Sequence, residues 1–454
     1  MSVSTAIPKG TRDFSPSEMN RRKYIFQVLE EVFRRYGYLP IETPAMELLS
    51  TLTGKYGEEG DRLIFKILNS GNFTEDLDSD ALQKLSPPAL AARICEKALR
   101  YDLTVPFARF VVQHRAELVF PFKRYQIQPV WRADRPQRGR YREFFQCDVD
   151  VIGTRSLLCE VELMQIIDDI FSRLGILVNI HVNNRKILTG IAEVLGQAER
   201  FTDITVAMDK LDKAGEDKVR EEMLQKGIPE TAAEHLMQIL RTSGNPAEKI
   251  NNLRSQLQSS ATGMEGLAEL ESMLSYLDDL GLRAAVDFDL SLARGLNYYT
   301  GAIFEVKAKE VQMGSICGGG RYDDLTGIFG LPGVSGVGVS FGADRIYDVM
   351  NELKLFPSAT EGTSRVLFAN FGGEEERYSL KILDMMRRNG VSAEMYPDAV
   401  KMKKQFAYAD DKKIPYVAVI GSEERQAHQL SLKNLNTGEQ LALSPEEAIA
   451  KLKS

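Results

Sequence analysis

Three arginines in separate parts of the sequence have the side-chain chemistry to bind an anion together. Arg132 ends a strand-like run, Arg294 lies in a second such run, and Arg345 follows a glycine-rich stretch. A guanidinium group makes paired hydrogen bonds to phosphate oxygens. Three of them from different elements suit a polyphosphate, which needs donors from several directions, whereas one isolated arginine is more typical of a surface.

Other residues near these arginines offer a second chemistry, the recognition of a cation or a polar ring. Asp102 and Asp150 are carboxylates that could hold an ammonium group or an imidazole. Tyr298 and Tyr299 fall in a predicted pair of strands. Successive strand residues point to opposite faces, so we expect one phenol on each face, and one of the two could belong to the core.

Glycines gather in two stretches, SICGGGRYDDLTGIFG (315–330) and LPGVSGVGVSFGADRIYDVM (331–350). Neither GxxxxGK[ST] nor a GxGxxG that opens a helix after a strand occurs there, so neither a P-loop nor a dinucleotide fold is predicted. The glycines let the backbone approach a ligand or a neighbouring strand, or they are packing glycines. The second stretch predicts a strand that enters a helix, with Arg345 near the start of that helix.

The element that must position Arg132 is a hairpin over residues 122–153, FKRYQIQPVWRADRPQRGRYREFFQCDVDVIG. Its flanks alternate as strands do, and its polar middle is broken by Pro136 and Gly139, which predicts a long loop. Taken alone, the segment is equally compatible with a solvated hairpin rich in charge.

Length and composition restrict the class of protein. The 454 residues imply two to four domains, and 43% hydrophobic with 27% charged residues is ordinary for a globular chain. No run of about 18 apolar residues predicts a membrane span. The net charge of −7 disfavours indiscriminate coating of nucleic acid but allows one local basic surface.

The N-terminus lacks the pattern of a secretion signal. Four widely spaced cysteines without a CxxC pair support neither a zinc site nor a disulfide framework, so we expect a cytoplasmic protein. These cysteines are Cys95, Cys147, Cys159 and Cys317.

Along the first part of the chain, Ser15 and Glu18 predict a capping box at the start of a long amphipathic helix. We expect a strand and a turn over 61–73, a loop over 74–96, and a helix after Pro106.

Further along, a composition rich in Ala, Leu, Glu, Lys and Gln predicts a helical insertion over 185–280. Strands are expected again over 284–309. The last ninety residues predict an α/β unit, in which several lysines could form a basic face for RNA. These are Lys401, Lys403, Lys404, Lys412 and Lys413.

Six segments in this order resemble the histidyl-tRNA synthetase family of class II aminoacyl-tRNA synthetases. They are GTRDFSP, DLTVPFAR, WRADRPQRGRYREFFQ, RGLNYYTG, GGGRYDD and GVGVSFGADR. The resemblance implies an α+β catalytic core with the antiparallel class II sheet, a helical insertion and a C-terminal α/β anticodon-binding domain. It implies four parts of the chain: core residues 1–184, insertion 185–280, core 281–355 and anticodon-binding domain 363–454.

The resemblance also implies roles for individual residues. Arg132, Arg294 and Arg345 would be catalytic and, with Phe144, would bind ATP. The histidine-binding residues would be Asp102, Thr104, Gln146, Asp150, Tyr298, Tyr299 and Tyr322. The tRNA acceptor end would meet Arg135, Gln137 and Arg138, and Glu305 is a candidate Mg²⁺ ligand.

The chain departs from the family pattern at a few positions. Many members carry glutamate where this chain has Asp102, Asp134 and Asp150, which keeps the charge and shortens its reach by one methylene. Asn297 stands where aspartate is common.

The implied reaction joins L-histidine to tRNA(His), with ATP as a substrate, Mg²⁺ bound with the ATP, no zinc, and a homodimer that does not enter a membrane. The first alternative is the non-catalytic regulatory subunit of ATP phosphoribosyltransferase, which resembles the core but lacks the anticodon-binding unit. The second is another class II synthetase, such as the threonyl or glycyl enzyme, and RGLNYYTG argues against it.

Overall fold

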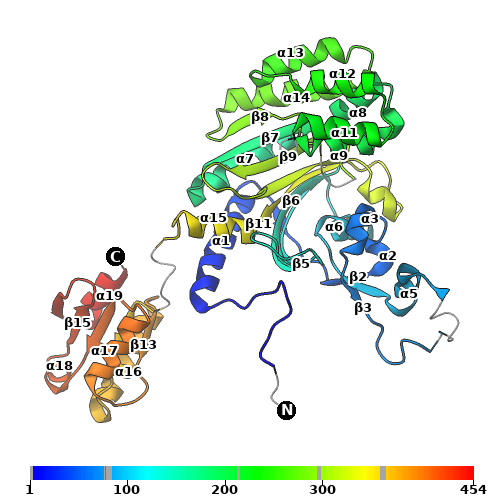
Figure 1. Ribbon diagram of the computed structural model, residues 1–454. Coiled ribbons are helices and arrows are strands. Elements are labelled where there is room, and N and C mark those ends of the chain that lie inside the picture. Colours follow the sequence, from blue (N-terminus) through cyan, green and yellow to red (C-terminus); the bar gives the residue numbers. More distant parts are fainter. Residues whose placement is uncertain are drawn as a thin grey trace. The chain divides into compact units, whose positions relative to one another are not determined.

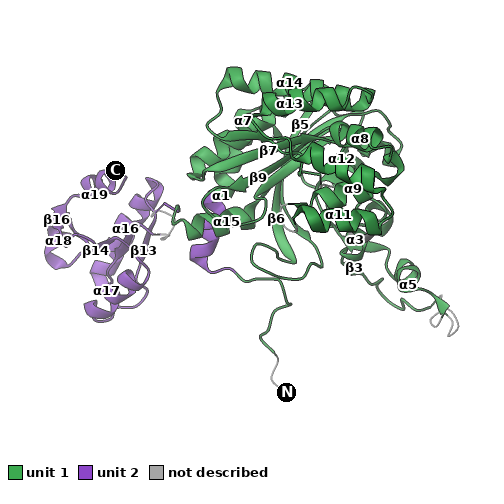
Figure 2. Ribbon diagram, turned by 45° about the horizontal axis from the view of Figure 1, so that its top comes forward, with its two compact units in different colours: residues 1–13, 25–355 green, residues 14–24, 356–454 purple. Residues whose placement is uncertain are grey.

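The computed structural model describes residues 4–75, 77, 84–211, 215–293, 298–357 and 364–453. The chain forms two compact units, residues 1–13 with 25–355 and residues 14–24 with 356–454 (Figure 2). Within the described part of the chain, no helix is long and apolar enough to cross a bilayer.

The first unit is built on an eight-stranded sheet, counted over the described residues (Figure 1). Its six central strands are antiparallel neighbours, and one strand is added in parallel at each edge. In spatial order the strands are β1 (Leu39–Pro40), β5 (Phe122–Trp131), β6 (Glu143–Ile152), β11 (Gly336–Gly342), β10 (Cys317–Tyr322), β9 (Ala302–Ala308), β7 (Val178–Asn184) and β8 (Ala285–Phe288).

The predicted hairpin is confirmed. Strands β5 and β6 pair in register from Phe122 opposite Ile152 to Trp131 opposite Glu143, and residues 132–142 form the loop. Because side chains alternate along a strand, Gln146, Asp148 and Asp150 all point to one face of β6.

Helix α1 (Pro16–Arg35) begins with the predicted capping box. The Ser15 amide donates to Glu18 Oε2 at 2.7 Å, and the Glu18 amide donates to Ser15 Oγ at 3.4 Å. The other described helices of the sheet-containing part are α2 (Leu49–Leu52), α3 (Gly57–Arg62), α5 (Pro87–Ile94), α6 (Thr104–Gln113), α7 (Leu158–Leu174), η2 (Leu325–Phe329) and α15 (Ala343–Glu352).

Helices fill the described part of residues 185–280 and lie along the β7–β8 end of the sheet (Figure 1). Close glycine contacts join α8 to α14, where a Cβ on Gly190 would lie 2.4 Å from the Gly263 Cα. The elements are α8 (Arg185–Val194), η1 (Ala198–Arg200), α9 (Phe201–Met208), α11 (Glu216–Gln225), α12 (Glu230–Leu240), α13 (Pro246–Gln256) and α14 (Ala261–Leu280).

One of the two expectations for the region before the hairpin was wrong. The expected loop over 74–96 contains α5, which begins at Pro87 with proline at its first two positions, where a missing N–H costs no helical hydrogen bond. The strand and turn expected over 61–73 are present: the strand is the short β3 (Lys66–Ile67), which joins β2 (Met46–Leu48) and β4 (Lys97–Leu99) in a small sheet, and a turn begins at Phe73.

Two further expectations needed correction. The helix expected after Pro106 begins earlier, at Thr104, because Asp102 accepts a hydrogen bond from the Val105 amide at 3.1 Å. The strands expected over 284–309 are present as β8 and β9, but Tyr298 and Tyr299, predicted to fall in a pair of strands, lie between β8 and β9 in no strand. The rings of Tyr298 and Tyr299 are therefore not on opposite faces; they contact each other edge to face, 5.0 Å apart.

The second unit contains a five-stranded sheet, counted over its described residues, in the order β13-β12-β14-β15-β16. The α/β unit predicted for the last ninety residues is confirmed. The elements are β12 (Val366–Phe368), α16 (Gly373–Arg388), β13 (Ala393–Met395), α17 (Met402–Asp411), β14 (Tyr416–Val419), α18 (Ser422–Gln426), β15 (Leu430–Asn434), β16 (Gln440–Leu443) and α19 (Pro445–Lys453).

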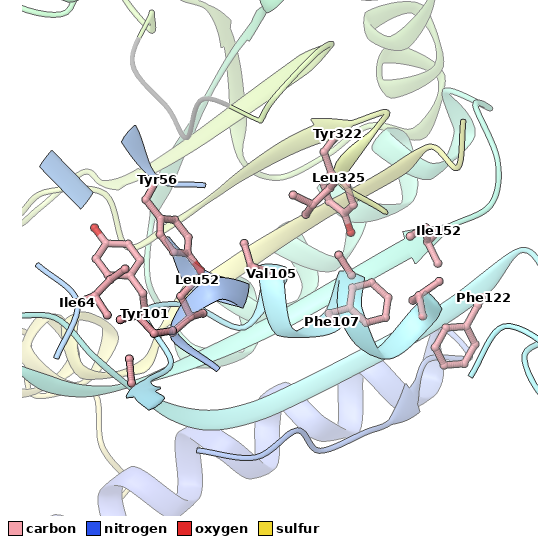
Figure 3. Packing of buried hydrophobic residues seen from close by; sticks show 14 of the residues in the cluster. Leu52, Tyr56, Ile64, Tyr101, Val105, Phe107, Phe122, Ile152, Tyr322 and Leu325 are labelled. Atoms are coloured by element: carbon pink, nitrogen blue, oxygen red, sulfur yellow. The ribbon is translucent and has the colours of Figure 1, made fainter. Parts of the chain in front are cut away.

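One hydrophobic cluster of the first unit, shown in Figure 3, supplies side chains that line the candidate site described below. Val105 and Phe107 of α6 belong to it, as does Tyr322 of β10. Tyr56 and Tyr101 also belong to it, with ring centroids 4.4 Å apart. This packing fixes the ends of α6 and β10, from which the polar groups of the site project.

Candidate functional site

A cleft of about 870 Å³ lies in the first unit. The predicted nucleotide-binding residues Arg132, Phe144 and Arg345 line it, and so does Gln146. The hairpin, β10, β11 and α15 form one part of its wall, and α8 and α9 contribute the other. The volume lies in the range of small-molecule and cofactor sites.

The Arg132 guanidinium is held between two aromatic rings at the mouth of the hairpin. Its Cζ lies 4.3 Å from the centre of the Tyr101 ring and 5.3 Å from that of Phe144. Its Nε donates to the Tyr101 carbonyl at 3.0 Å. The two terminal nitrogens have no partner among the described residues, so they are available to an anion in the cleft.

Arg345 lies on the first turn of α15, as the glycine-rich stretch predicted. Its Nε donates to the Gly139 carbonyl at 2.8 Å and its Nη1 donates to the Ser315 carbonyl. Burial lowers the pKa of Arg345, and the positive charges of Arg140 and Arg132 lower it further. A cleft in which arginines repel one another favours the binding of an anion.

The N-terminal segment ties the hairpin to α15. Arg12 forms an ion pair with Asp344, and its Cζ lies 3.3 Å from the centre of the Tyr141 ring. Asp344 also accepts a hydrogen bond from the Phe145 amide at 2.9 Å. The Tyr141 hydroxyl donates to Asp348 of α15 at 2.9 Å. The base of the hairpin loop is thereby fixed beside the cleft.

The three residues predicted to meet tRNA lie at the tip of the hairpin loop. Arg135, Gln137 and Arg138 are exposed. A backbone bridge between Gln137 and Arg140 shapes the tip, and Arg138 forms an ion pair with Glu352.

A second, much smaller cavity adjoins the cleft, because Gly318 and Ser340 line both. Thr104, Asp150, Tyr299 and Tyr322, all predicted to bind histidine, line the small cavity together with Asp148, Gly338 and Val339. Its volume of about 20 Å³ has room for about one water molecule, so side chains must move to admit a ring.

Asp150, which lines the small cavity, belongs to a buried ion pair. Arg124, which is fully buried, places Nη2 2.8 Å from Asp150 Oδ2, and its Cζ lies 4.1 Å from the centre of the Phe107 ring. The Tyr322 hydroxyl donates to Asp150 Oδ1 at 2.7 Å. Burial raises the pKa of Asp150, and Arg124 opposes that rise.

Asp102 is the centre of a neighbouring network. Its Oδ1 accepts from the Tyr56 hydroxyl at 2.9 Å and its Oδ2 from the Tyr298 hydroxyl at 3.4 Å. Burial raises the pKa of Asp102, and these hydrogen bonds oppose the rise. Gln146 donates to the Ser340 hydroxyl at 2.8 Å and keeps a buried Oε1 without a partner among the described residues.

Among the described residues that were predicted to bind histidine or Mg²⁺, Asp102, Tyr298 and Glu305 line neither cavity. Arg294 lies outside the described residues. Glu305 of β9 lines neither cavity and forms an ion pair with Lys307 at 3.1 Å. The described residues hold no group of three or more acidic, histidine or cysteine side chains that could bind a metal ion.

Sequence reasoning missed Arg12, Tyr56, Arg124 and Asp148 as parts of the site. The alternation along β6 was a signal for Asp148, because it lies between Gln146 and Asp150 on the same face. Nothing in the sequence alone brings Arg12 or Tyr56 to the cleft, since both come from distant segments.

An antiparallel sheet with arginines at a cleft and carboxylates in an adjoining cavity defines the core of a class II aminoacyl-tRNA synthetase. The family model described as histidyl-tRNA synthetase matches residues 10–75 and 96–346, and the model described as anticodon binding domain matches residues 365–454. The chain belongs to the histidyl-tRNA synthetase family. The resemblance and the fold class predicted from the sequence are therefore confirmed.

Two relatives match the chain over its whole length. The histidine–tRNA ligase of Phocaeicola vulgatus is 57% identical over 454 residues, and that of Bacteroides fragilis is 57% identical over 452 residues; each alignment covers 100% of both chains. The crystal structure of histidyl-tRNA synthetase from Nostoc sp. PCC 7120 is similar with a TM-score of 0.84 and 29% identity, covering 100% of this chain and 99% of that one.

The glycine at position 338 makes room for Asp150, which leads to a prediction. A Cβ at this position would lie 2.0 Å from Asp150 Oδ1. We expect Gly338→Ala to lower the free energy of unfolding by about 1–3 kcal/mol through overpacking. The matched control is Gly314→Ala, whose Cβ would meet only the end of the Arg345 side chain, with Nη1 at 3.6 Å and Cζ at 3.9 Å; we expect a change in the free energy of unfolding within about 0.5 kcal/mol. Urea unfolding of both variants measures this, and equal stability would show that the close contact is not restrictive.

Proposed function

We propose that the protein is a histidine–tRNA ligase. It activates L-histidine with ATP to give histidyl-adenylate and pyrophosphate, and then transfers histidine to the 3′ end of tRNA(His). The observation that carries this proposal is the joining of two cavities at Gly318 and Ser340, one lined by arginines and the other by buried carboxylates. Full-length relatives that are 57% identical histidine–tRNA ligases support it.

In the first step the carboxylate of histidine attacks the α-phosphorus of ATP and pyrophosphate leaves. Arg132, whose terminal nitrogens are available in the cleft, contacts the α-phosphate together with Arg294, and Arg345 lies against the other phosphates. Fixed guanidinium groups stabilise the charge that develops on the phosphate oxygens. Phe144 stacks on adenine. Holding both reactants in place supplies much of the acceleration, so no covalent protein nucleophile is needed.

Histidine is held in the small cavity and at its border. Asp102, Thr104 and Gln146 bind the α-amino group and its surroundings, and the unpartnered Gln146 Oε1 is one acceptor for it. Asp150 and Tyr299 bind the imidazole, and the remaining pocket residues are Tyr298 and Tyr322. Buried groups that pair with a polar ring reject analogues without it by roughly 10⁴–10⁵-fold, so no editing site is required.

Magnesium accompanies ATP in this proposal. The described side chains offer few carboxylates at the cleft, and Glu305 is a candidate ligand only if it leaves Lys307. The protein thus fits a mode in which the phosphates supply most of the ligands and the chain supplies one or two carboxylates. The ion neutralises phosphate charge when bound. The chemistry proposed here has no use for zinc.

The tRNA would contact two parts of the chain. Its acceptor end meets Arg135, Gln137 and Arg138 at the exposed hairpin tip. Residues 363–454 form an anticodon-binding domain, whose exposed lysines give it a basic face. The lysines of this basic face are Lys401, Lys403, Lys404, Lys412 and Lys413.

The rest of the chain is divided into two further parts in this proposal. Residues 1–184 and 281–355 form the catalytic core, and residues 185–280 form an inserted helical domain.

Two copies of the chain form the active assembly in this proposal. The segment after α1 carries exposed apolar side chains at Leu39, Met46 and Leu48, which are 59%, 54% and 57% exposed. Apolar side chains grouped beside an edge strand suit a protein interface. We also propose that the protein acts in the cytoplasm, where its substrates are found.

The regulatory-subunit alternative is disfavoured by the same comparisons. A structure described as an ATP phosphoribosyltransferase regulatory subunit/histidyl-tRNA synthetase from Bacillus halodurans C is similar with a TM-score of 0.71 but 22% identity, which concerns the fold alone. The full-length ligase relatives and the match of residues 365–454 to an anticodon binding domain favour the enzyme.

Exchange of pyrophosphate into ATP tests the proposed activity directly. The purified protein should support exchange when histidine is present. It should support no exchange with any other standard amino acid. Arg294→Ala should lower the exchange rate by about 10²–10³-fold, because it removes a group that stabilises the transition state. Arg254→Ala, which breaks an exposed pair with Glu271, is the control and should leave the rate unchanged. Exchange that does not depend on histidine would contradict the proposed activity. A normal exchange rate in Arg294→Ala would contradict the role of Arg294.

Removal of residues 363–454 tests the division of labour between the domains. The shortened protein should retain histidine-dependent exchange and lose tRNA affinity by about 100-fold, since one of two linked contact sites is gone. Aminoacylation as a function of tRNA concentration, measured beside exchange, separates the two effects. Equal loss of both activities would reject the division, provided that circular dichroism shows the shortened protein to be folded.

A further inference from the structure

The small cavity holds a carboxylate to which the proposed function gives no role. Asp148 of β6 is 2% exposed and lines the cavity beside Asp150 and Tyr299. Its Oδ1 is buried and has no hydrogen-bond partner among the described residues. A buried carboxylate oxygen is costly unless a donor reaches it, and an N–H group of a ligand can be that donor.

The charges around Asp148 do not balance. Arg124 is the closest cation to both carboxylates, with Nη2 2.8 Å from Asp150 Oδ2 and 4.0 Å from Asp148 Oδ2. Asp150 also accepts from the Tyr322 hydroxyl, so it has a close counter-ion and a strong hydrogen bond. One guanidinium with two ionised carboxylates leaves one negative charge, and that charge belongs to Asp148.

The protonation of Asp148 responds to this imbalance. The pKa of Asp148 is raised to about 7, chiefly by burial. The positive charge of Arg124 opposes this rise, the negative charge of Asp150 adds to it, and a hydrogen bond from Ser340 lowers the pKa again. The titratable and charged groups that face Asp148 from the surrounding elements are Arg124 of β5, Asp150 of β6, Asp102 before α6, Tyr299, and Cys317 and Tyr322 of β10.

We propose that Asp148 is a second ring-binding carboxylate, and that Asp148 and Asp150 together hold the side chain of histidine as an imidazolium cation. This inference rests on the proposed function. A neutral imidazole has one N–H donor and one bare nitrogen, whereas imidazolium has two N–H donors. Two carboxylates accept without donating, so they match the cation.

The proton that charges the ring comes from Asp148 when neutral histidine enters. The O–H bond of the Asp148 carboxyl breaks and an N–H bond forms at the bare ring nitrogen. The products are a carboxylate and an imidazolium, so the total charge of the cavity does not change. The imidazolium then provides the second positive charge, so that each of the two carboxylates has a cation beside it.

This exchange fixes the sign of the pH dependence. The complex holds one proton between the ring and Asp148. Above about pH 7 both the free ring, whose ordinary pKa is about 6.5, and free Asp148 are unprotonated, so binding takes up a proton. Below about pH 6.5 both are protonated, so binding releases one. Affinity should therefore peak between these values and fall on both sides.

Calorimetric titration with L-histidine tests the inference. Titrations of the full-length protein in buffers of different ionisation enthalpy give the number of protons bound with the ligand. At about pH 8 the wild type should take up about 0.9 proton per histidine, and its dissociation constant should be about fivefold higher than at about pH 6.8. Asp148→Asn should take up close to none and should lose the alkaline fall in affinity. Asp289→Asn is the control: this carboxylate, on the segment after β8, pairs with His181 and lines neither cavity, so the variant should behave as the wild type.

The possible results are distinguishable. Binding without proton uptake by the wild type would overturn the inference, and this result needs no variant, so it stands even where Asp148→Asn fails to fold. Uptake that persists in Asp148→Asn would assign the proton to another group and overturn the role of Asp148. Absence of histidine binding at every pH would reject the proposed function itself. The α-amino group titrates equally in all three proteins and cancels in the comparison.

Discussion

The buried ion pair between Arg124 and Asp150 is the constraint on which the site depends. A charged pair without water is tolerable only when its partners are held in place, because removal of either one leaves an uncompensated charge. The sheet provides this placement: Arg124 and Asp150 lie opposite each other on β5 and β6, and the Phe107 ring and the Tyr322 hydroxyl fix their side chains. Asp150, held by this pair, lines the small cavity, which joins the arginine-lined cleft at Gly318 and Ser340.

Glycine is what allows such a polar face to exist inside a sheet. Asp150 stands opposite Gly338, and a Cβ on Gly319 would lie 2.0 Å from the Gly338 carbonyl. Side chains at these positions would fill the space that the aspartate and the tyrosines use. The glycine-rich stretches thus act through close approach of strands and side chains, one of the two readings left open by the sequence. Glycine also matters between the two cavities. Gly318, which has no side chain, lines both the cleft and the small cavity at the point where they join.

Local signals in the sequence predicted much of the fold and part of the site. Rules that act within a few residues predicted three features that the structure confirms. They are the capping box at Ser15, the hairpin around Arg132 and the helix that begins just before Arg345. Tyr298 and Tyr299 were placed wrongly because a β-type composition continues through these two residues, which lie in no strand. Arg124, Arg12 and Tyr56 were missed because only tertiary structure brings them to the cavities. The resemblance to a family supplied roles that no local pattern contains.

A crystal structure of the protein with L-histidine and a non-hydrolysable ATP analogue tests the central claim most directly. The account predicts the ring within about 3 Å of carboxylate oxygens of both Asp148 and Asp150, a typical hydrogen-bond length, with Arg124 still paired with Asp150. It also predicts the α-phosphate beside Arg132, across the boundary formed by Gly318 and Ser340. A ring bound outside the small cavity, or one that leaves both aspartates without contact, would contradict the account.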